Sequence, residues 1–171
     1  SFLQKFPFHV KLNRYYSPFL LHVLAFESFN LSDFDVVLSC SSRFAHFVIT
    51  KPETKHICYM HSPGRMIWEP FDYFENEKYG VLRLLKLKSN RFLKLSLSYL
   101  RIADFNASKR VDLFVANSKV SRNRIKKYYG RNSEIMYPFF DFENFAGARS
   151  EKGDYFLVLT RLVSWKKVDI A

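Results

Sequence analysis

Short apolar runs bounded by polar residues recur along the chain and predict buried β-strands. Within the run KHICYM, a period of two places Cys58 and Met60 on the face opposite to Ile57 and Tyr59. Five such runs occur in all, at residues 33–40 (DFDVVLSC), 55–60 (KHICYM), 111–118 (VDLFVANS), 134–138 (EIMYP) and 154–162 (DYFLVLTRL).

Segments with helical character separate these strands. Residues 43–50 (RFAHFVIT) fit a short helix, and residues 79–108, which contain no proline, predict one long helix or two abutting ones. Residues 119–130 (KVSRNRIKKYYG) predict a helix that Ser118 caps and that Gly130 ends in the left-handed conformation. After the fifth strand, residues 163–171 (VSWKKVDIA) enter another helix.

The alternation of strand and helix predicts an α/β fold with a mainly parallel sheet. In such sheets ligands bind beyond the carboxyl ends of the strands. Ser41, His61, Ser118 and Arg161 all fall at these ends, so we expect a binding site there.

Composition supports one well-cored globular domain, with 48% apolar and 18% aromatic residues in 171. The 27 Lys and Arg residues exceed the 16 Asp and Glu residues, which gives a net charge of +11. This charge favours nucleic acid, phosphorylated small molecules or an anionic membrane surface as partners.

Uncharged apolar stretches such as residues 17–26 are shorter than the roughly 20 residues of a membrane span. Two cysteines, Cys40 and Cys58, exclude a disulfide scaffold, and we expect buried reduced thiols in a cytosolic protein.

The passage HICYMHSPGRMIW at residues 56–68 holds the first candidate site residues. His61 ends a strand just before a tight Ser-Pro-Gly turn. The guanidinium group of Arg65 can bind phosphate or carboxylate through two hydrogen bonds, and the ring of Trp68 offers a flat surface for a sugar or a base. Each has a structural alternative: a packed histidine, a surface salt bridge and a core tryptophan. His56 and His61 lie five apart across a strand end, so we expect no shared metal.

Two further pairs follow strand ends. Asn117 and Ser118 precede a helix whose free N–H groups face any nearby anion, although a plain helix cap also explains Ser118. Arg161 and Lys166 are spaced to close on a diphosphate from two sides, with a solvated basic turn as the alternative. The sequence has neither a Walker loop nor a dinucleotide-binding glycine pattern, so side chains would hold the phosphates.

Three segments, HICYMHSPGRMIWE, RIADFNASKRVDLFVANSKVSRNRIKKYYGRNSEIMYPFFD and DYFLVLTRLVSWKKVDIA, resemble glycosyltransferase family 4 in the same order and at similar spacing. The resemblance runs from about residue 33 to residue 171. It implies a Rossmann-like parallel sheet and a retaining enzyme of the GT-B fold that uses a nucleotide-sugar donor. Residues 1–150 would form most of the N-terminal, acceptor-side domain, and residues 151–171 the first strand and turn of the C-terminal, nucleotide-sugar-binding domain.

The resemblance also assigns roles to single residues. His61 matches the histidine of the family's His-Thr-Pro turn, which lies by the donor sugar, and Ser62 replaces the threonine. We therefore expect His61 to be the catalytic residue. Arg65 and Trp68 match residues after that turn and would lie on the acceptor or sugar side, as would the Asn117 and Ser118 pair.

Arg161 and Lys166 match the family's basic pair, which grips the donor diphosphate. They would stabilise the departing diphosphate without a metal or other cofactor. Thr160 replaces the glycine that usually precedes this arginine. The paired glutamates of the family's second domain lie downstream of the residues in this chain, so we expect the chain by itself to be inactive.

The implied partners are a nucleotide-sugar donor, with a mannosyl donor as one candidate, and a glycan or lipid-linked acceptor. The implied location is cytoplasmic, with peripheral membrane contact through the basic, leucine-rich residues 81–101 unless these pack across the sheet. The alternative function is a basic, non-enzymatic nucleic-acid-binding α/β protein, suggested by SRNRIKKYYGR at residues 121–131. Because standard nucleic-acid-binding motifs are missing from the sequence, we expect no nucleic acid partner.

Overall fold

The computed structural model describes residues 21–70, 91–143, 153–160 and 168–170. Helices and parallel strands alternate along this part of the chain, which confirms the α/β class. The elements, in order, are α2 (Leu21–Glu27), β1 (Val36–Ser41), the 3-10 helix η2 (Ala45–Phe47), β2 (Lys55–Met60), α3 (Arg65–Trp68), α6 (Arg91–Lys109), β3 (Leu113–Ala116), α7 (Lys119–Tyr129), β4 (Glu134–Ile135) and the 3-10 helix η5 (Val168–Ile170).

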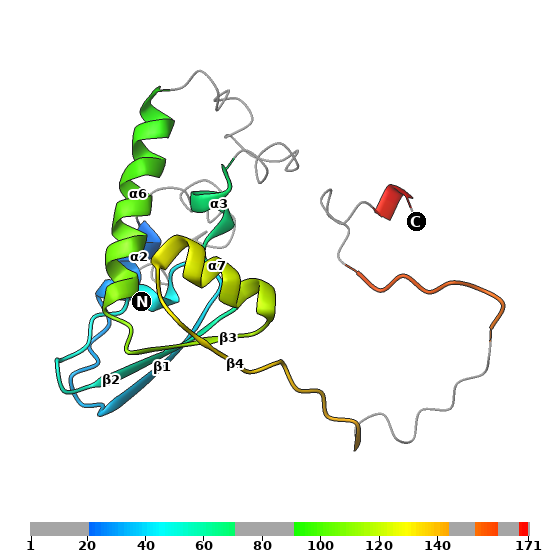
Figure 1. The fold of residues 1–171 in the computed structure, drawn as a ribbon, viewed down its shortest axis with the longest axis horizontal. Coiled ribbons are helices and arrows are strands. Elements are labelled where there is room, and N and C mark those ends of the chain that lie inside the picture. The colour runs from blue at the N-terminus through cyan, green and yellow to red at the C-terminus, as the bar shows by residue number, and fades with distance from the viewer. Residues whose placement is uncertain (1–20, 71–90, 144–152, 161–167, 171) are drawn as a thin grey trace, which may run out of the picture.

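The four strands form one sheet in the order β1-β2-β3-β4, and every neighbouring pair is parallel. The register pairs Ser41 with Met60, Met60 with Ala116, and Ala116 with Ile135. The carboxyl ends of all four strands therefore meet at one edge. In Figure 1 the long helix α6 and the shorter α7 lie on the same side of this sheet. The arrangement is consistent with a Rossmann-like fold.

The two faces of the sheet differ in burial. On the face toward the helices, Ser39, Cys58 and Phe114 are buried side by side on β1, β2 and β3. On the opposite face Val36 is 57% exposed and Leu38 is 71% exposed. The strand predicted over residues 33–40 forms as β1, but only one of its faces is buried, because β1 is an edge strand in the described sheet and the described helices cover one of its faces.

Two apolar clusters hold the described helices to the sheet. The first joins α2, η2, α3 and α6 through buried residues that include Val23, Phe47, Ile67 and Leu100. The second joins β2, β3 and α7, and its buried members are Cys58, Met60, Val111, Phe114, Ala116, Ile125 and Tyr129. Trp68 packs against both clusters, so it links α3 to α7.

Both ends of α7 agree with the sequence prediction. The Ser118 hydroxyl accepts a hydrogen bond from the Ser121 N–H at 3.1 Å, which satisfies a donor that the first helical turn leaves unpaired. Gly130 follows the helix with φ of 69°, and its N–H donates to the Lys126 carbonyl at 3.1 Å. A side chain would strain this left-handed position, which explains the glycine.

Other predicted elements are shorter than expected. The helix over residues 43–50 is limited to the three residues of η2, because Val48 turns to an extended conformation with ψ of 143°. The strand over residues 111–118 is limited to β3, and the strand over residues 134–138 to the two residues of β4. Of the helix predicted over residues 79–108, α6 confirms the part from residue 91, and residues 79–90 lie outside the described residues.

The predicted fifth strand, residues 154–162, does not form over its described residues, 154–160. Residues 154–160 have no strand assignment, since their backbone pairs with no other strand in the described parts of the chain. Their apolar side chains are accordingly exposed, with Phe156 and Leu159 each more than 90% accessible. Of the helix expected over residues 163–171, only η5 lies within the described residues.

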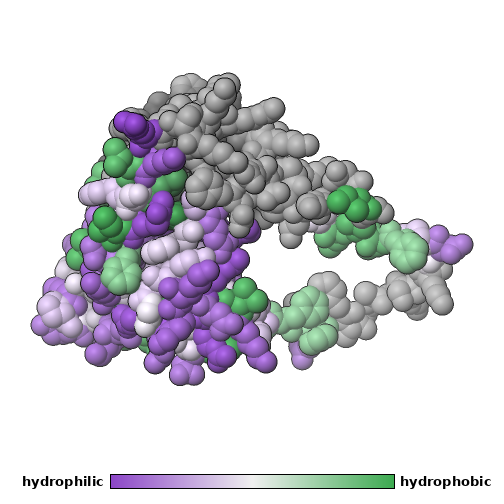
Figure 2. Space-filling model, turned by 45° about the horizontal axis from the view of Figure 1, so that its top comes forward, coloured by the Kyte–Doolittle hydropathy of each residue, from purple (hydrophilic) through white to green (hydrophobic). Residues whose placement is uncertain are grey.

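Helix α6 contains the described part of the segment considered for membrane contact. Leu97 and Leu100 are buried in the first apolar cluster, which supports packing of this segment, whereas Leu95 and Ile102 are more than 60% exposed. Figure 2 shows a largely hydrophilic main body, with hydrophobic residues on the side where α6 lies and also on the segment that leads toward the C-terminus. No helix in the described part of the chain is both long and apolar enough to cross a membrane.

A buried histidine makes the stability of the sheet depend on pH. His56 is fully buried on β2, with Nε2 2.8 Å from the Ser39 hydroxyl, and its backbone N–H donates to Asp112 Oδ2 at 2.8 Å. The pKa of His56 is lowered from 6.5 to about 4, mainly by burial and also by the charges of His46 and Arg110, while Asp112 opposes the shift. Below about pH 6.5 the unfolded chain therefore takes up the proton while the folded chain does not.

We predict that the free energy of unfolding falls as the pH is lowered from about 6.5 to about 4, because His56 resists protonation in the folded state. His56→Gln removes this titration and should give a shallower pH dependence in the same window. Urea unfolding monitored by circular dichroism at several pH values measures both slopes. Equal slopes for the variant and the unmodified chain would contradict the prediction.

Candidate functional site

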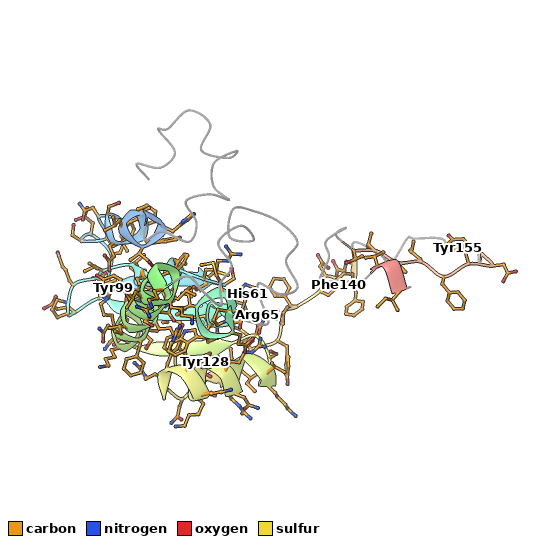
Figure 3. The ribbon with its side chains drawn as sticks, turned by 90° about the horizontal axis from the view of Figure 1, so that it is seen from above. His61, Arg65, Tyr99, Tyr128, Phe140 and Tyr155 are labelled. Carbon is orange, nitrogen blue, oxygen red and sulfur yellow. The ribbon has the colours of Figure 1, made fainter. Side chains whose placement is uncertain are left out.

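His61 lies at the carboxyl edge of the sheet, directly after β2, as the sequence predicts. Its backbone N–H donates to the Ser41 carbonyl on β1 at 2.8 Å, and its carbonyl accepts a hydrogen bond from the Ser121 hydroxyl on α7. The side chain is exposed. The backbone is thus held from both sides while the imidazole faces solvent, and Figure 3 shows it on the same side of the domain as Arg65.

Two neighbouring strand ends position the imidazole. His61 Nε2 is 3.2 Å from the Cys40 sulfur, and Nδ1 is 3.4 Å from Asn117 Nδ2. The Tyr59 ring lies edge-on to it at 5.4 Å. Cys40 is exposed, so the expectation of two buried thiols is wrong for Cys40 and correct for Cys58.

Cys40 was missed as a site residue by sequence reasoning. Its side chain alternates with the buried Ser39 and Ser41, so it projects from the open face of β1. Which face of β1 is open depends on the helices, because they cover the other face (Figure 1). The alternation in the sequence was the available signal, but it does not by itself say which face is covered.

Asn117 and Ser118 are held by a compact set of hydrogen bonds at the start of α7. The Asn117 N–H donates to the Met60 carbonyl at 3.3 Å, which extends the β2–β3 pairing by one step. Asn117 Oδ1 lies 3.1 Å from the Ser118 hydroxyl and 2.6 Å from the Ser121 hydroxyl. Ser118 therefore acts as a helix cap, and Asn117 presents its amide group to His61.

Arg65 makes the salt bridge that the sequence offered as its structural alternative. Its Nε is 3.2 Å from Glu69 Oε2, one helical turn away. The Arg124 guanidinium approaches the same oxygen at 3.3 Å, and the Tyr128 hydroxyl donates to Glu69 Oε1 at 2.8 Å. Two guanidinium groups share one carboxylate, so positive charge remains behind the turn that follows His61.

These contacts set the ionisation of Glu69. Partial burial raises its pKa, but the hydrogen bond from Tyr128 and the charges of Arg124 and Arg65 outweigh burial, and the pKa is lowered overall. Glu69 therefore stays charged at neutral pH. It ties α3 to α7 beside the candidate site.

The contacts of Trp68 favour its structural alternative, a packed residue. One face of the indole stacks on Tyr128, with centroids 4.9 Å apart and planes at 19°. The indole N–H donates to Asp104 Oδ2 at 2.6 Å. One face of the Trp68 ring thus packs on α7, and its N–H group is hydrogen-bonded to α6.

Asp104 is the centre of a buried polar network that sequence reasoning missed. The Tyr129 hydroxyl donates to Asp104 Oδ2 at 2.8 Å, and His46 Nε2 is 3.1 Å from Oδ1. The other nitrogen of His46 is 3.1 Å from the Ser41 hydroxyl. Burial of Tyr129, with Asp104 beside it, raises the pKa of Tyr129 well above its ordinary value. The available signal was a lone aspartate flanked by apolar residues in the stretch IADF.

The set Ser41, His46 and Asp104 has the residue types of a hydrolytic triad. All three side chains are fully buried, so a substrate could not reach the Ser41 hydroxyl without unfolding the surrounding core. Their role is structural, because the contacts from Ser41 to His46 and from His46 to Asp104 join β1, η2 and α6 inside the core.

The remaining predicted site residues, Arg161 and Lys166, lie outside the described residues. The division into domains at residue 150 and the distance from His61 to the basic pair therefore stay predictions. Within the described ranges, no three His, Cys, Asp or Glu side chains gather in a way that could hold a metal ion.

Comparisons of the chain with protein-family models, with characterised proteins and with solved structures find no match.

We predict that Asp104→Ala lowers the free energy of unfolding by about 3–5 kcal/mol, because it leaves the polar atoms of His46, Trp68 and Tyr129 buried without their shared acceptor. Urea unfolding followed by tryptophan fluorescence measures this loss. Asn106→Ala, on the exposed face of the same helix, is the matched control and should change stability little. A loss below about 1 kcal/mol for Asp104→Ala would contradict the central role of this carboxylate.

Proposed function

We propose that this chain is part of a retaining, nucleotide-sugar-dependent glycosyltransferase of the GT-B type and supplies the acceptor-side wall of its cleft. The resemblance of three ordered segments to glycosyltransferase family 4 supports the proposal. The observation that carries it is the place of His61, an exposed imidazole held at the carboxyl edge of a parallel sheet.

The geometry around His61 suits recognition of a polar ligand such as a sugar. Ligands of open parallel sheets bind beyond the carboxyl ends of the strands, where His61 lies. Its backbone is fixed by Ser41 and Ser121, and its ring by Cys40 and Asn117, so its nitrogens have defined directions. In the proposal a sugar hydroxyl near the reacting carbon takes the place of Cys40 or Asn117 as the partner of one ring nitrogen, and a ring already held in one direction loses little entropy on binding.

The charge near this edge also suits the proposed reaction. The two positive charges of Arg65 and Arg124 exceed the single negative charge of Glu69, so net positive charge lies beside the His61 turn. In the proposal Arg161 and Lys166 hold the donor diphosphate and stabilise the negative charge that develops as the sugar departs. The sugar passes to an acceptor hydroxyl on a glycan or lipid, and its anomeric configuration is retained.

In the complete enzyme of which we expect this chain to be a part, His61→Ala and Arg161→Ala should each lower transfer by about 100-fold or more, because each removes a group placed at the developing charge or the sugar. Release of nucleoside diphosphate from a panel of nucleotide sugars, with and without a glycan or lipid-linked acceptor, measures the transfer. Normal turnover by either variant would remove the role that we assign to that residue.

Lys167→Ala is the matched control for Arg161, since Lys167 is a neighbouring cation that the proposal leaves in solvent. It should keep near-normal turnover. Unchanged thermal unfolding of all three variants would show that lost activity does not reflect lost structure. Failure of the unmodified enzyme to consume any nucleotide sugar would overturn the proposed function itself.

The exposed face of α7 keeps one alternative open, that of a nucleic-acid-binding protein. Its solvent side carries the exposed cations Lys119, Arg122, Lys126 and Lys127. The phosphate backbone of a nucleic acid could lie along such a face. The same pattern is also that of a solvated helix, and Lys127 already lies over the Tyr128 ring at 5.3 Å.

We expect weak binding of RNA and DNA with little sequence preference, because no described element presents a standard nucleic-acid-binding motif. Filter binding at several salt concentrations measures it. A steep fall in affinity with salt that becomes shallower in the Arg122→Ala and Lys126→Ala double variant would favour the nucleic-acid alternative over glycosyl transfer.

A further inference from the structure

Three side chains with complementary chemistry meet at the ends of neighbouring strands. Cys40 on β1, His61 after β2 and Asn117 after β3 follow one another across the sheet, with 3.2 Å from Sγ to Nε2 and 3.4 Å from Nδ1 to the amide nitrogen. A thiol that faces a nitrogen of an imidazole, with a third group orienting that ring, is in a position where its thiolate form can be stabilised. We propose that Cys40 is a reactive thiol controlled by His61, and that it is a site of covalent modification by peroxides and small electrophiles.

The hydrogen bonds around Asn117 decide how the imidazole acts. Asn117 Oδ1 faces the hydroxyls of Ser118 and Ser121, so the amide turns its Nδ2 hydrogens toward His61. His61 Nδ1 then accepts, which assigns the ring hydrogen to Nε2. The Nε2–H group points at the Cys40 sulfur. An N–H donated to sulfur stabilises negative charge there, and the charged thiolate is the nucleophilic form of cysteine.

Accessibility separates Cys40 from the second cysteine of the chain. Cys40 is exposed on the open face of β1, whereas Cys58 is fully buried in the apolar cluster of β2, β3 and α7. Burial also raises the pKa of the Cys58 thiol to about 12. The chain thus contains an unreactive thiol that serves as an internal reference for the reactive one.

The reaction with a hydroperoxide balances without any other group. The Cys40 thiol gives its proton to solvent, and the thiolate attacks one peroxide oxygen. A sulfur–oxygen bond forms, the oxygen–oxygen bond breaks, and hydroxide leaves and takes a proton from solvent. Sulfur is oxidised by two electrons to sulfenic acid, and the peroxide is reduced by the same two.

The test treats the folded chain with hydrogen peroxide in the presence of dimedone, which traps sulfenic acid, and follows the adduct by intact mass and peptide mapping. Iodoacetamide alkylation measures the same thiol without oxidation. We expect one adduct per chain on Cys40, none on Cys58, and none after Cys40→Ser. His61→Asn should slow both reactions by about tenfold, and Asn117→Ala by a smaller factor.

Asn123→Ala, an exposed asparagine on α7, is the matched control and should react at the normal rate. Equal rates for His61→Asn and the unmodified chain would overturn the proposal. If a variant unfolds, Cys58 is labelled as well, and that variant no longer tests the proposal. The unmodified chain still does: a reaction rate of Cys40 at pH 7 no higher than that of glutathione would also overturn the proposal.

The inference does not rest on glycosyl transfer, since neither assay contains a nucleotide sugar. A failed transfer assay leaves the reactivity of Cys40 unchanged, and an inert Cys40 leaves the transfer proposal unchanged. Both proposals share His61, so an adduct on Cys40 would stand within 3.2 Å of the imidazole that we assign to the sugar.

Discussion

The buried carboxylate of Asp104 is the contact on which the rest of the described structure depends. It lies in the C-terminal half of α6 and is contacted by Trp68 from α3, Tyr129 from α7 and His46 from η2. A charge in a fully buried position is costly unless several donors surround it, so these elements must keep their mutual positions. Apolar packing alone would tolerate sliding, whereas a shared acceptor fixes direction as well as distance.

The candidate site around His61 is connected to the Asp104 network through Ser41. Ser41 contributes its hydroxyl to His46 inside the core and its carbonyl to the His61 backbone at the sheet edge. Ser121 of α7 holds the His61 carbonyl from the other side. The exposed imidazole is therefore supported by elements that the Asp104 carboxylate fixes, which is the arrangement that a site needs if its direction is to be set before a ligand arrives.

Several local features could be predicted because their causes are local. The cap at Ser118, the left-handed Gly130 and the position of His61 after a strand follow from residue type and neighbours alone. The separation of Cys58 and Met60 from Ile57 and Tyr59 follows from the strand period. Of the fifth strand predicted over residues 154–162, the described residues 154–160 form no strand, because an apolar run becomes a strand only where a neighbour offers hydrogen bonds.

The sequence by itself determined the α/β class, the parallel sheet and the positions of Ser41, His61 and Ser118 at its carboxyl edge, because period and turn chemistry act over a few residues. The tertiary structure alone decided that Cys40 is exposed beside His61, that Trp68 is occupied by Tyr128 and Asp104, and that Arg65 shares Glu69 with Arg124. Most of these contacts join residues of different elements, and Trp68 and Tyr128 lie 60 positions apart in the sequence. No local pattern encodes which face of a strand a distant helix will cover.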